Sequence, residues 1–331
     1  MSEQQPLLQV LNISKQYANG LLISNISFQQ KKLQKIAIAG ASGAGKTTLL
    51  KIISGNAQPN DGKVLLNGIK VIGPDEQLLP GHPQMGYLSQ HYELLNNYKV
   101  EDLIWFDNKL PIDEASKLFN VCQINHLLKR KTDQLSGGEK QRIALCKLLV
   151  KSPQLLLLDE PFSNLDLIHK NTLKEVLTNI TSKLQITCIL TSHDPQDILS
   201  WADEILVMQD GVIIQKGTGE QIYYHPINEY VAGLFGKYNL LTPKQVKALF
   251  GNAMFIHNTQ QLLIRPEQLY ISTLANTSFA ARVINSSFWG NHYELQLQVD
   301  EVFLIMNTLH KEAEIGDIIS VGINMEKIGF V

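Results

Sequence analysis

The stretch with the clearest chemistry is a glycine-rich loop at residues 40–48, which reads GASGAGKTT. It fits the pattern G-x-x-x-x-G-K-[ST] of a phosphate-binding P-loop. Glycines let the backbone wrap closely round an anion, so that successive N–H groups point inward. Lys46 is predicted to reach the β- and γ-phosphates of a nucleotide, and Thr47 to offer its hydroxyl to Mg²⁺. The predicted nucleotide contacts are Gly40, Ser42, Gly43, Ala44, Gly45, Lys46, Thr47 and Thr48.

The residues on either side of this loop predict the elements that position it. Residues 35–39 form a short apolar run that suits a buried strand, and residues 49–54 have the apolar spacing of a helix. A helix that starts directly after the loop adds the positive end of its dipole to the anion site. The alternative is a glycine-rich turn with a chance lysine.

Two carboxylates follow a second apolar run. Residues 155–158 are four leucines, as in a parallel strand buried on both faces, and Asp159 and Glu160 come directly after them. Open α/β sheets place ligands at the C-terminal edge of their strands. We therefore predict that Asp159 positions Mg²⁺ and that Glu160 orients and polarises the attacking water. A solvated pair at a strand end is the alternative.

Further polar residues occupy comparable positions. His193 follows an apolar strand at residues 186–191, and Gln90 closes a short strand. Ser136 and Gly138 lie at the start of a helix, where they form a second anion-binding nest or a routine helix cap. Tyr17 either stacks on an adenine ring or packs on the core.

Composition excludes several classes of function. A length of 331 residues suggests two domains, and 44% hydrophobic with 18% charged residues is typical of a soluble globular protein. The net charge of -2 gives no overall attraction to nucleic acid. Three scattered cysteines indicate a reducing compartment. We expect no signal peptide. No apolar run approaches the roughly 20 residues that span a bilayer, so any membrane role would require a partner.

In order and combination, the motifs of residues 7 to about 235 resemble the nucleotide-binding subunit of an ABC transporter. The resemblance implies an α/β P-loop NTPase fold, with a RecA-like core, an antiparallel β subdomain and a helical subdomain at about residues 91–134. It identifies the remaining motifs as an adenine-stacking Tyr17, a Q-loop at Gln90, a signature at residues 135–138, a D-loop at residues 163–166 and a switch histidine at His193.

The family mechanism then implies roles for these residues. Two copies would face each other head to tail, so that ATP and Mg²⁺ on the P-loop of one copy meet Ser136 and Gly138 of the other. Phosphoryl transfer would proceed by positioning and electrostatics. One departure from the family pattern is Glu139, where the signature usually ends in Gln. The implied catalytic residues are Glu160 as general base, His193, Gln90 and Lys46, and the implied Mg²⁺ ligands are Thr47, Gln90 and Asp159.

The C-terminal part resembles a TOBE domain, a small all-β, OB-like barrel. Arg265-Pro266-Glu267 matches a short motif near its start, and strands separated by turns follow from residue 279. The expected organisation is an ATPase domain at 1–235, a linker at 236–260 and a barrel at 261–331. Such barrels occur on the ATPases of importers. The alternative is a small packing or dimerisation barrel that binds no ligand of its own.

Together these features predict an ATPase that powers an importer at the cytoplasmic face of the inner membrane. Its partners would be permease subunits and, indirectly, an extracytoplasmic substrate-binding protein, with ferric iron, a polyamine or a sugar as substrate. The alternative is a soluble ABC ATPase acting on the ribosome or DNA. Such proteins usually carry tandem cassettes or a long coiled coil, and this chain shows neither. A non-hydrolytic regulatory module is disfavoured by Glu160 and His193.

Overall fold

The computed structural model describes residues 5–16, 22–91, 94–250, 260–272 and 278–331. The chain divides into two compact units, residues 1–219 and 220–331, and each is described by itself. The boundaries expected from the sequence, at residues 235 and 260, stay a prediction. Within the described ranges, no helix is both long and apolar enough to cross a bilayer.

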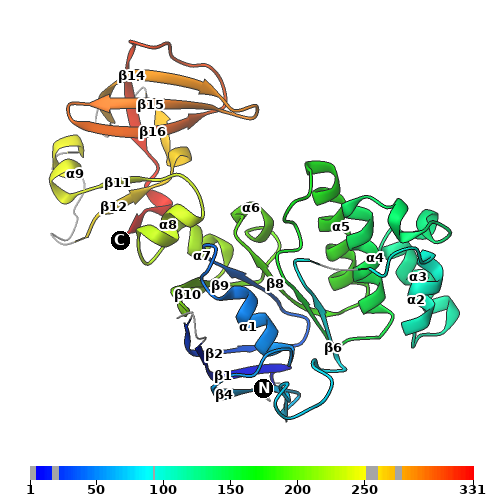
Figure 1. Cartoon of the computed structure of the whole chain (residues 1–331). Coiled ribbons are helices and arrows are strands. Elements are labelled where there is room, and N and C mark those ends of the chain that lie inside the picture. Colours follow the sequence, from blue (N-terminus) through cyan, green and yellow to red (C-terminus); the bar gives the residue numbers. More distant parts are fainter. Residues whose placement is uncertain (1–4, 17–21, 92–93, 251–259, 273–277) are drawn as a thin grey trace. The chain divides into compact units, whose positions relative to one another are not determined.

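A six-stranded sheet forms the centre of unit 1 (Figure 1), in the order β10-β9-β3-β8-β7-β6. The strands from β9 to β6 pair in parallel, and β10 pairs antiparallel to β9 at the edge. The apolar runs predicted as buried strands form β3 and β7, and all four leucines of β7 are buried. The strand bounds are β3 Lys35–Ala39, β6 Met85–Leu88, β7 Leu155–Leu158, β8 Thr187–Ser192, β9 Glu204–Gln209 and β10 Val212–Gly217.

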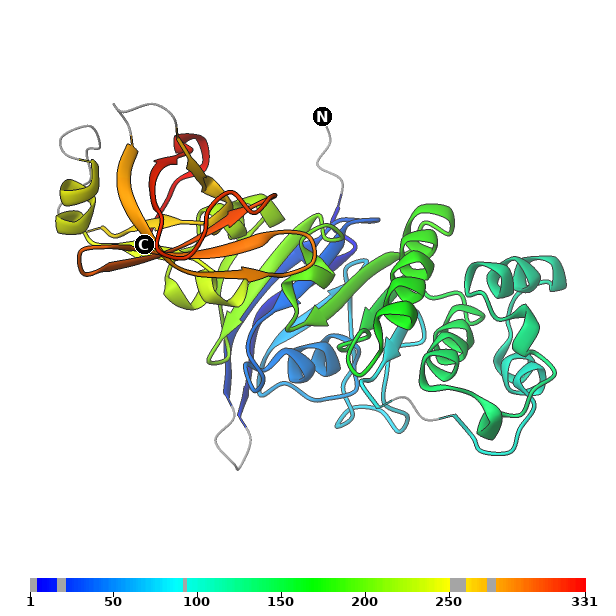
Figure 2. The same ribbon diagram turned by 90° about the horizontal axis from the view of Figure 1, so that it is seen from above.

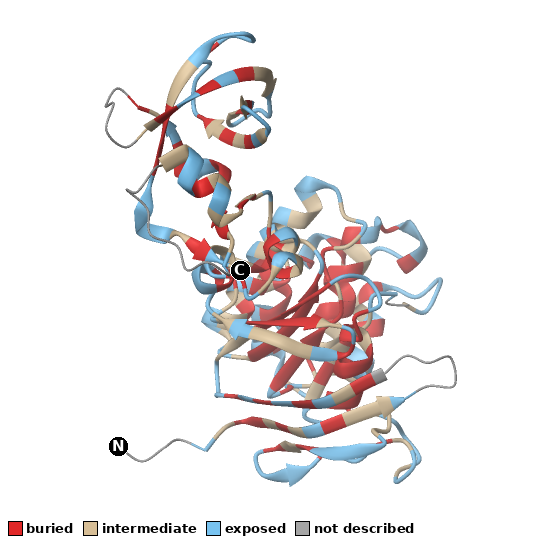
Figure 3. Ribbon diagram, turned by 90° about the vertical axis from the view of Figure 1, so that its left-hand side faces the viewer, coloured by how far each residue is buried: buried red, intermediate tan, exposed pale blue. Residues whose placement is uncertain are grey.

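A second, antiparallel sheet in the order β2-β1-β4-β5 forms the antiparallel β subdomain that the resemblance implied. Its apolar side chains share one core with α1 (Lys46–Ile53) and with the inner strands of the six-stranded sheet. Figure 3 shows the buried residues concentrated in these strands. The packing holds α1, and therefore the loop before it, against the strand layer. The strand bounds are β1 Leu8–Gln16, β2 Leu22–Gln30, β4 Asp61–Leu66 and β5 Ile69–Lys70.

The remaining helices of unit 1 lie near the other strands. In both views, α2 (Val100–Asp107) and α3 (Ile112–Val121) lie at one end of the unit, beyond α4 (Gly137–Leu149) (Figure 1 and Figure 2). They form the helical part expected at about residues 91–134. The long helix α5 (Leu167–Lys183) precedes β8, and the short α6 (Pro195–Ile198) follows it.

Unit 2 contains two sheets, in the orders β11-β12-β18 and β13-β17-β14-β15-β16. The larger sheet curls round one apolar core, and within the described ranges no ladder joins its edge strands β13 and β16. The predicted all-β domain is therefore a half-barrel. From the boundary of unit 2 onward, the helices and strands are α7 Gly219–Tyr224, α8 Glu229–Leu234, β11 Asn239–Leu241, α9 Pro243–Phe250, β12 Leu262–Ile264, β13 Leu269–Ile271, β14 Ser278–Phe288, β15 Tyr293–Val299, β16 Val302–Thr308, β17 Ile318–Ile323 and β18 Gly329–Phe330.

Candidate functional site

The parallel register brings four of the predicted motifs to one edge of the core sheet. Ala39 pairs with Ser192 at the ends of β3 and β8, and Leu158 pairs with Leu88 at the ends of β7 and β6. Because all four strands run the same way, their carboxyl ends meet at that edge. The loop at residues 40–45, the carboxylates after β7, His193 and Gln90 all follow these ends directly.

The P-loop joins β3 to α1 as the sequence predicts. Gly45 caps α1 with a left-handed backbone, φ 98°, which a residue with a side chain rarely adopts. The Lys46 side chain is 4% exposed, and its Nζ donates to the carbonyl oxygens of Gly40 at 2.8 Å and Ala41 at 3.0 Å. Burial lowers the pKa of Lys46, and the nearby Glu160 and Asp159 oppose that shift. A buried ammonium therefore lies inside the loop.

Asp159 is almost completely buried and accepts three side-chain hydrogen bonds. Oδ1 accepts from Thr47 at 3.0 Å and from Thr191 at 2.9 Å, and Oδ2 accepts from the Tyr87 hydroxyl at 3.1 Å. Burial and the adjacent Asp159 raise the pKa of Tyr87, so its hydroxyl keeps its proton and remains a donor. The carboxylate is thereby fixed beside the threonine at the start of α1.

Glu160 lies between Lys46 and His193. Its Oε1 is 3.6 Å from Lys46 Nζ, and its Oε2 is 3.0 Å from His193 Nδ1. Oε2 also accepts from the Ser163 hydroxyl at 2.9 Å. A carboxylate only accepts hydrogen bonds, so the histidine proton in this contact is on Nδ1. The backbone of Glu160 is left-handed, φ 46°, and its N–H donates to Thr191 Oγ1 at 2.8 Å.

The signature residues lie at the start of α4. Ser136 caps the helix and forms a reciprocal capping box with Glu139. Gly138 lies against His169 of α5, where a Cβ atom would come within 2.6 Å of the imidazole ring. Asp166 holds that ring through His169 Nδ1 at 2.7 Å. In the described parts of the chain, Ser136 and Gly138 thus contact residues of α4 and α5.

Two further predicted site residues are Gln90 and Tyr17. Gln90 is exposed and follows the end of β6 by two residues. Tyr17 lies outside the described residues, so its predicted stacking role is not addressed by the structure.

Sequence reasoning missed two residues of this site, Tyr87 and Thr191, and identified Ser163 only as part of the D-loop. Each holds one of the two carboxylates in place. The available signal was a polar side chain in an otherwise apolar strand. Thr191 is fully buried in β8, and Tyr87 lies in β6 next to β7.

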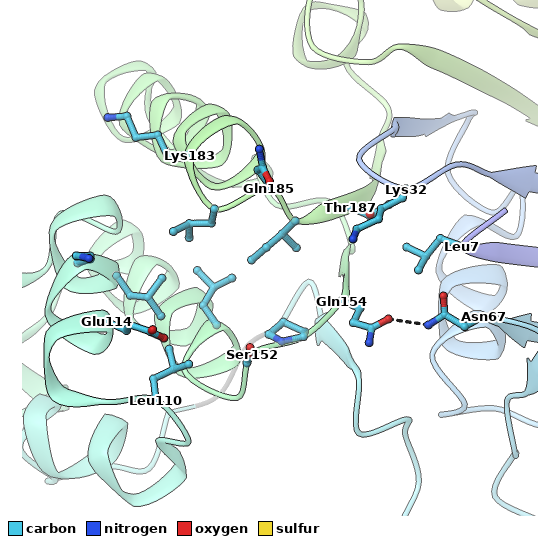
Figure 4. Close-up of a pocket in the computed structure, with 16 residues that line it drawn as sticks. Leu7, Lys32, Asn67, Leu110, Glu114, Ser152, Gln154, Lys183, Gln185 and Thr187 are labelled. Carbon is cyan, nitrogen blue, oxygen red and sulfur yellow. Dashed lines mark hydrogen bonds between the residues drawn. The ribbon is translucent and has the colours of Figure 1, made fainter. Parts of the chain in front are cut away.

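A pocket of about 760 Å³ lies elsewhere in unit 1. Figure 4 shows its lining, including the 2.7 Å hydrogen bond between Asn67 and Gln154. Residues 152–154 and 183–187 of the lining precede or begin β7 and β8. The pocket is therefore at the amino edge of the sheet, opposite the P-loop, and belongs to no predicted motif.

This geometry defines a P-loop ATPase: a lysine and a threonine on a glycine loop meet an Asp-Glu pair at the carboxyl edge of a parallel sheet. The comparisons specify the class further. The ABC transporter family model matches residues 23–163, and the TOBE domain model matches residues 262–328.

Three similar proteins are all named as import ATP-binding proteins. The chain is 34% identical over 318 residues to a spermidine/putrescine import ATP-binding protein of Mycoplasma mycoides, with 89% of each chain covered. It is 34% identical to a sulfate/thiosulfate import ATP-binding protein of Mesostigma viride, covering 87% of this chain and 86% of that one. A molybdate/tungstate import ATP-binding protein of Pyrococcus abyssi is also 34% identical, covering 90% of this chain and 91% of that one.

Two solved structures of ABC transporter components are also similar to this chain. The structure of cbiO1 from Clostridium perfringens, part of an ABC transporter complex, matches with TM-score 0.57 and 25% identity, covering 66% of this chain and 91% of that one. The ADP conformation of another ATP-binding cassette matches with TM-score 0.59 and 20% identity, covering 70% and 99%, which supports the fold. The chain belongs to the ATP-binding subunits of ABC importers that carry a C-terminal TOBE domain. It is an ATPase of that family.

Proposed function

We propose that two copies of this chain hydrolyse ATP in shared sites and drive a membrane permease. The observation that carries the proposal is the position of the Glu160 carboxylate between Lys46 and His193 at the edge of the P-loop sheet. In this proposal Glu160 is the acceptor for a water proton, and it lies next to Lys46, the cation proposed to bind phosphate. Phosphoryl transfer requires such positioning more than covalent chemistry.

Glu160 is the general base in this proposal. His193 and Ser163 orient Oε2, while Oε1 faces Lys46. A phosphate in the P-loop offers Lys46 a stronger anionic partner, so that Oε1 becomes available to a water molecule. His193, 53% exposed at the side chain, is the group that contacts the terminal phosphate and the water.

The donor set near Thr47 fits a magnesium ion, because Mg²⁺ prefers oxygen ligands such as hydroxyls and carboxylates. Thr47 Oγ1 and Asp159 Oδ1 are 3.0 Å apart at the start of α1, and Gln90 follows the neighbouring strand. We propose these three residues as the residues that hold the ion. When bound, Mg²⁺ supplies charge neutralisation at the phosphate oxygens.

The second half of each site comes from the partner copy. Ser136 and Gly138 lie at the N-terminus of a thirteen-residue helix, which favours anions. Within the chain these residues contact α4 and α5 rather than the P-loop lysine. A head-to-tail pair of cassettes would bring the α4 N-terminus of one copy to the nucleotide of the other. Tyr17 remains the residue proposed to stack on adenine.

The permease is proposed to dock on the helical part of unit 1. Contiguous patches of exposed apolar side chains mark interaction surfaces, whereas scattered single ones do not. Phe106 of α2 is 90% exposed and Ile112 at the start of α3 is 71% exposed. Docking there would hold the chain at the cytoplasmic face of the inner membrane. The relatives named for spermidine/putrescine, sulfate/thiosulfate and molybdate/tungstate import are each 34% identical to this chain, so identity does not favour one substrate. In this proposal the partner proteins select the substrate.

One pair of measurements tests the proposal. Glu160→Gln keeps the shape of the side chain but removes the base, so we expect ATP binding without turnover and an ATP-dependent dimer. Normal turnover in this variant would exclude Glu160 as the base. A tagged wild-type chain purified from native membranes should carry a permease-type protein. Recovery of ribosomal or DNA-repair proteins in its place would refute the import role.

A further inference from the structure

The signature region contains an ion pair at its one departure from the family pattern. Residue 139 is glutamate, whereas the family usually has glutamine there. Glu139 Oε2 accepts the backbone N–H of Ser136 at 2.8 Å, and Oε1 lies 3.5 Å from the guanidinium of Arg130. Arg130 belongs to the basic run Lys129-Arg130-Lys131, which precedes the signature.

Glu139 is a fixed negative charge in the first turn of α4. Although burial alone would raise it, the hydrogen bonds from Ser136 and the charges of Arg130 and Arg142 lower the pKa of Glu139. The carboxylate is therefore ionised at neutral pH. The positive end of the helix dipole attracts anions, so the Glu139 carboxylate competes there with a bound phosphate.

An ionised carboxylate next to a phosphate site repels the phosphate, and a neutral amide at the same position does not. We propose that Arg130 is a positioning residue for ATP hydrolysis: it neutralises Glu139 so that the α4 N-terminus of one copy accepts the phosphates bound to the other. This inference rests on the proposed head-to-tail dimer.

The surroundings favour Arg130 over its neighbours for this role. Lys131 Nζ donates to Asn97 at 2.8 Å, and the described parts of the chain show no ion pair for Lys129. Arg142, 7% exposed and one turn after Glu139, supplies a second positive charge that remains when Arg130 is replaced. The loss of Arg130 should therefore weaken ATP use without abolishing it.

The pair is also too exposed to matter greatly for folding. The side chains of Arg130 and Glu139 are 50% and 18% exposed, and an ion pair whose cation is half exposed to water contributes little stability. If Arg130 acts by neutralising Glu139, its replacement should change the affinity for ATP without changing Tm. A structural role would change both.

A double-mutant cycle on the full chain tests the inference. Arg130→Gln should raise the KM for ATP by about three- to tenfold at low salt, and the effect should shrink at high salt. Glu139→Gln keeps the capping box, because glutamine also accepts from the Ser136 N–H. In that background Arg130→Gln should leave KM unchanged. Lys129→Gln, which removes the same charge one residue away, is the matched control.

Two outcomes would overturn the inference: an equal rise in KM for Arg130→Gln and Lys129→Gln, or a rise for Arg130→Gln that persists in the Glu139→Gln background. The dimer itself has a separate readout in the Glu160→Gln variant with ATP. If that dimer forms while the cycle shows no coupling, the inference alone fails. If no ATP-dependent dimer forms, the proposed function fails and the inference fails with it.

Discussion

Thr191 joins the two acidic residues of the site through one hydroxyl group. It donates to Asp159 Oδ1 at 2.9 Å and accepts the backbone N–H of Glu160 at 2.8 Å. The side chain is fully buried, so water has no access to replace either bond. The strand that leads into His193 therefore also holds the Asp159 carboxylate and the Glu160 backbone, which follow the neighbouring strand.

Replacement of Thr191 by valine should reduce turnover more than ATP binding. Valine keeps the shape but leaves the Glu160 N–H unpaired, which costs about 1–3 kcal/mol for a buried group. We expect kcat to fall roughly tenfold or more, because the base loses its position. Thr191→Ser, which retains the hydroxyl, is the control. Equal kcat values for valine and serine would show that the hydroxyl has no such role.

Gly138 should tolerate alanine much less well than Gly137 does. A Cβ at Gly138 would lie 2.6 Å from the ring of His169, whereas a Cβ at Gly137 meets no atom within 4 Å. Overpacking of this kind costs about 1–3 kcal/mol. We expect Gly138→Ala to lower both Tm and the ATPase rate.

A suppressor separates this contact from a direct loss of phosphate binding. His169→Ala removes the ring and should restore the stability of Gly138→Ala. Thermal unfolding of the two single variants, the double variant and Gly137→Ala gives the comparison. If His169→Ala fails to restore Tm, the clash is not the cause.

Local patterns predicted much of the fold and the main site residues. The P-loop with its flanking strand and helix and the leucine run before Asp159 carry a motif or a clear apolar pattern, and the structure has strands and a helix at those places. The partners of the carboxylates depend on strand order instead. Tyr87, Asp159 and Thr191 are brought together by the pairing of β6, β7 and β8, which no local pattern specifies.

Asp197 should be more important for stability than an exposed acidic residue. Its side chain is 3% exposed and lies 2.7 Å from Lys170 Nζ and 3.1 Å from Lys174 Nζ. Removing one member of a fully buried pair costs about 3–5 kcal/mol. Because both lysines are partly exposed, we expect a smaller loss, about 2 kcal/mol, for Asp197→Asn.

The same variant should affect turnover, because Asp197 Oδ2 contacts Ser192, the residue before His193. Denaturant unfolding and kcat would be measured together. Glu76→Gln is the control, since its pair with Lys70 is exposed and should contribute little. A similar small effect for both variants would argue against a special role for Asp197.

Arg265 holds the first helices of unit 2 to its sheets. The sequence placed it in a family motif, and the structure shows its role: the side chain is fully buried and stacks on Tyr223, 4.1 Å from the ring centroid. Nε and both terminal nitrogens donate to backbone carbonyl oxygens. The acceptors are the carbonyls of Tyr223, Ala232, Gly236 and Lys237.

Arg265→Lys should therefore destabilise unit 2 although it keeps the charge. Lysine lacks the planar fork of donors, so several buried carbonyls lose their partners. We expect a loss of about 3 kcal/mol, measured by calorimetry of the full chain. Arg282→Lys is the control, because Arg282 is exposed on β14 and, among the residues that the structure describes, its side chain donates only to the Gly316 carbonyl at 3.4 Å. Equal Tm shifts for the two variants would contradict the assignment, because they would mean that the buried fork of Arg265 adds nothing beyond a surface contact.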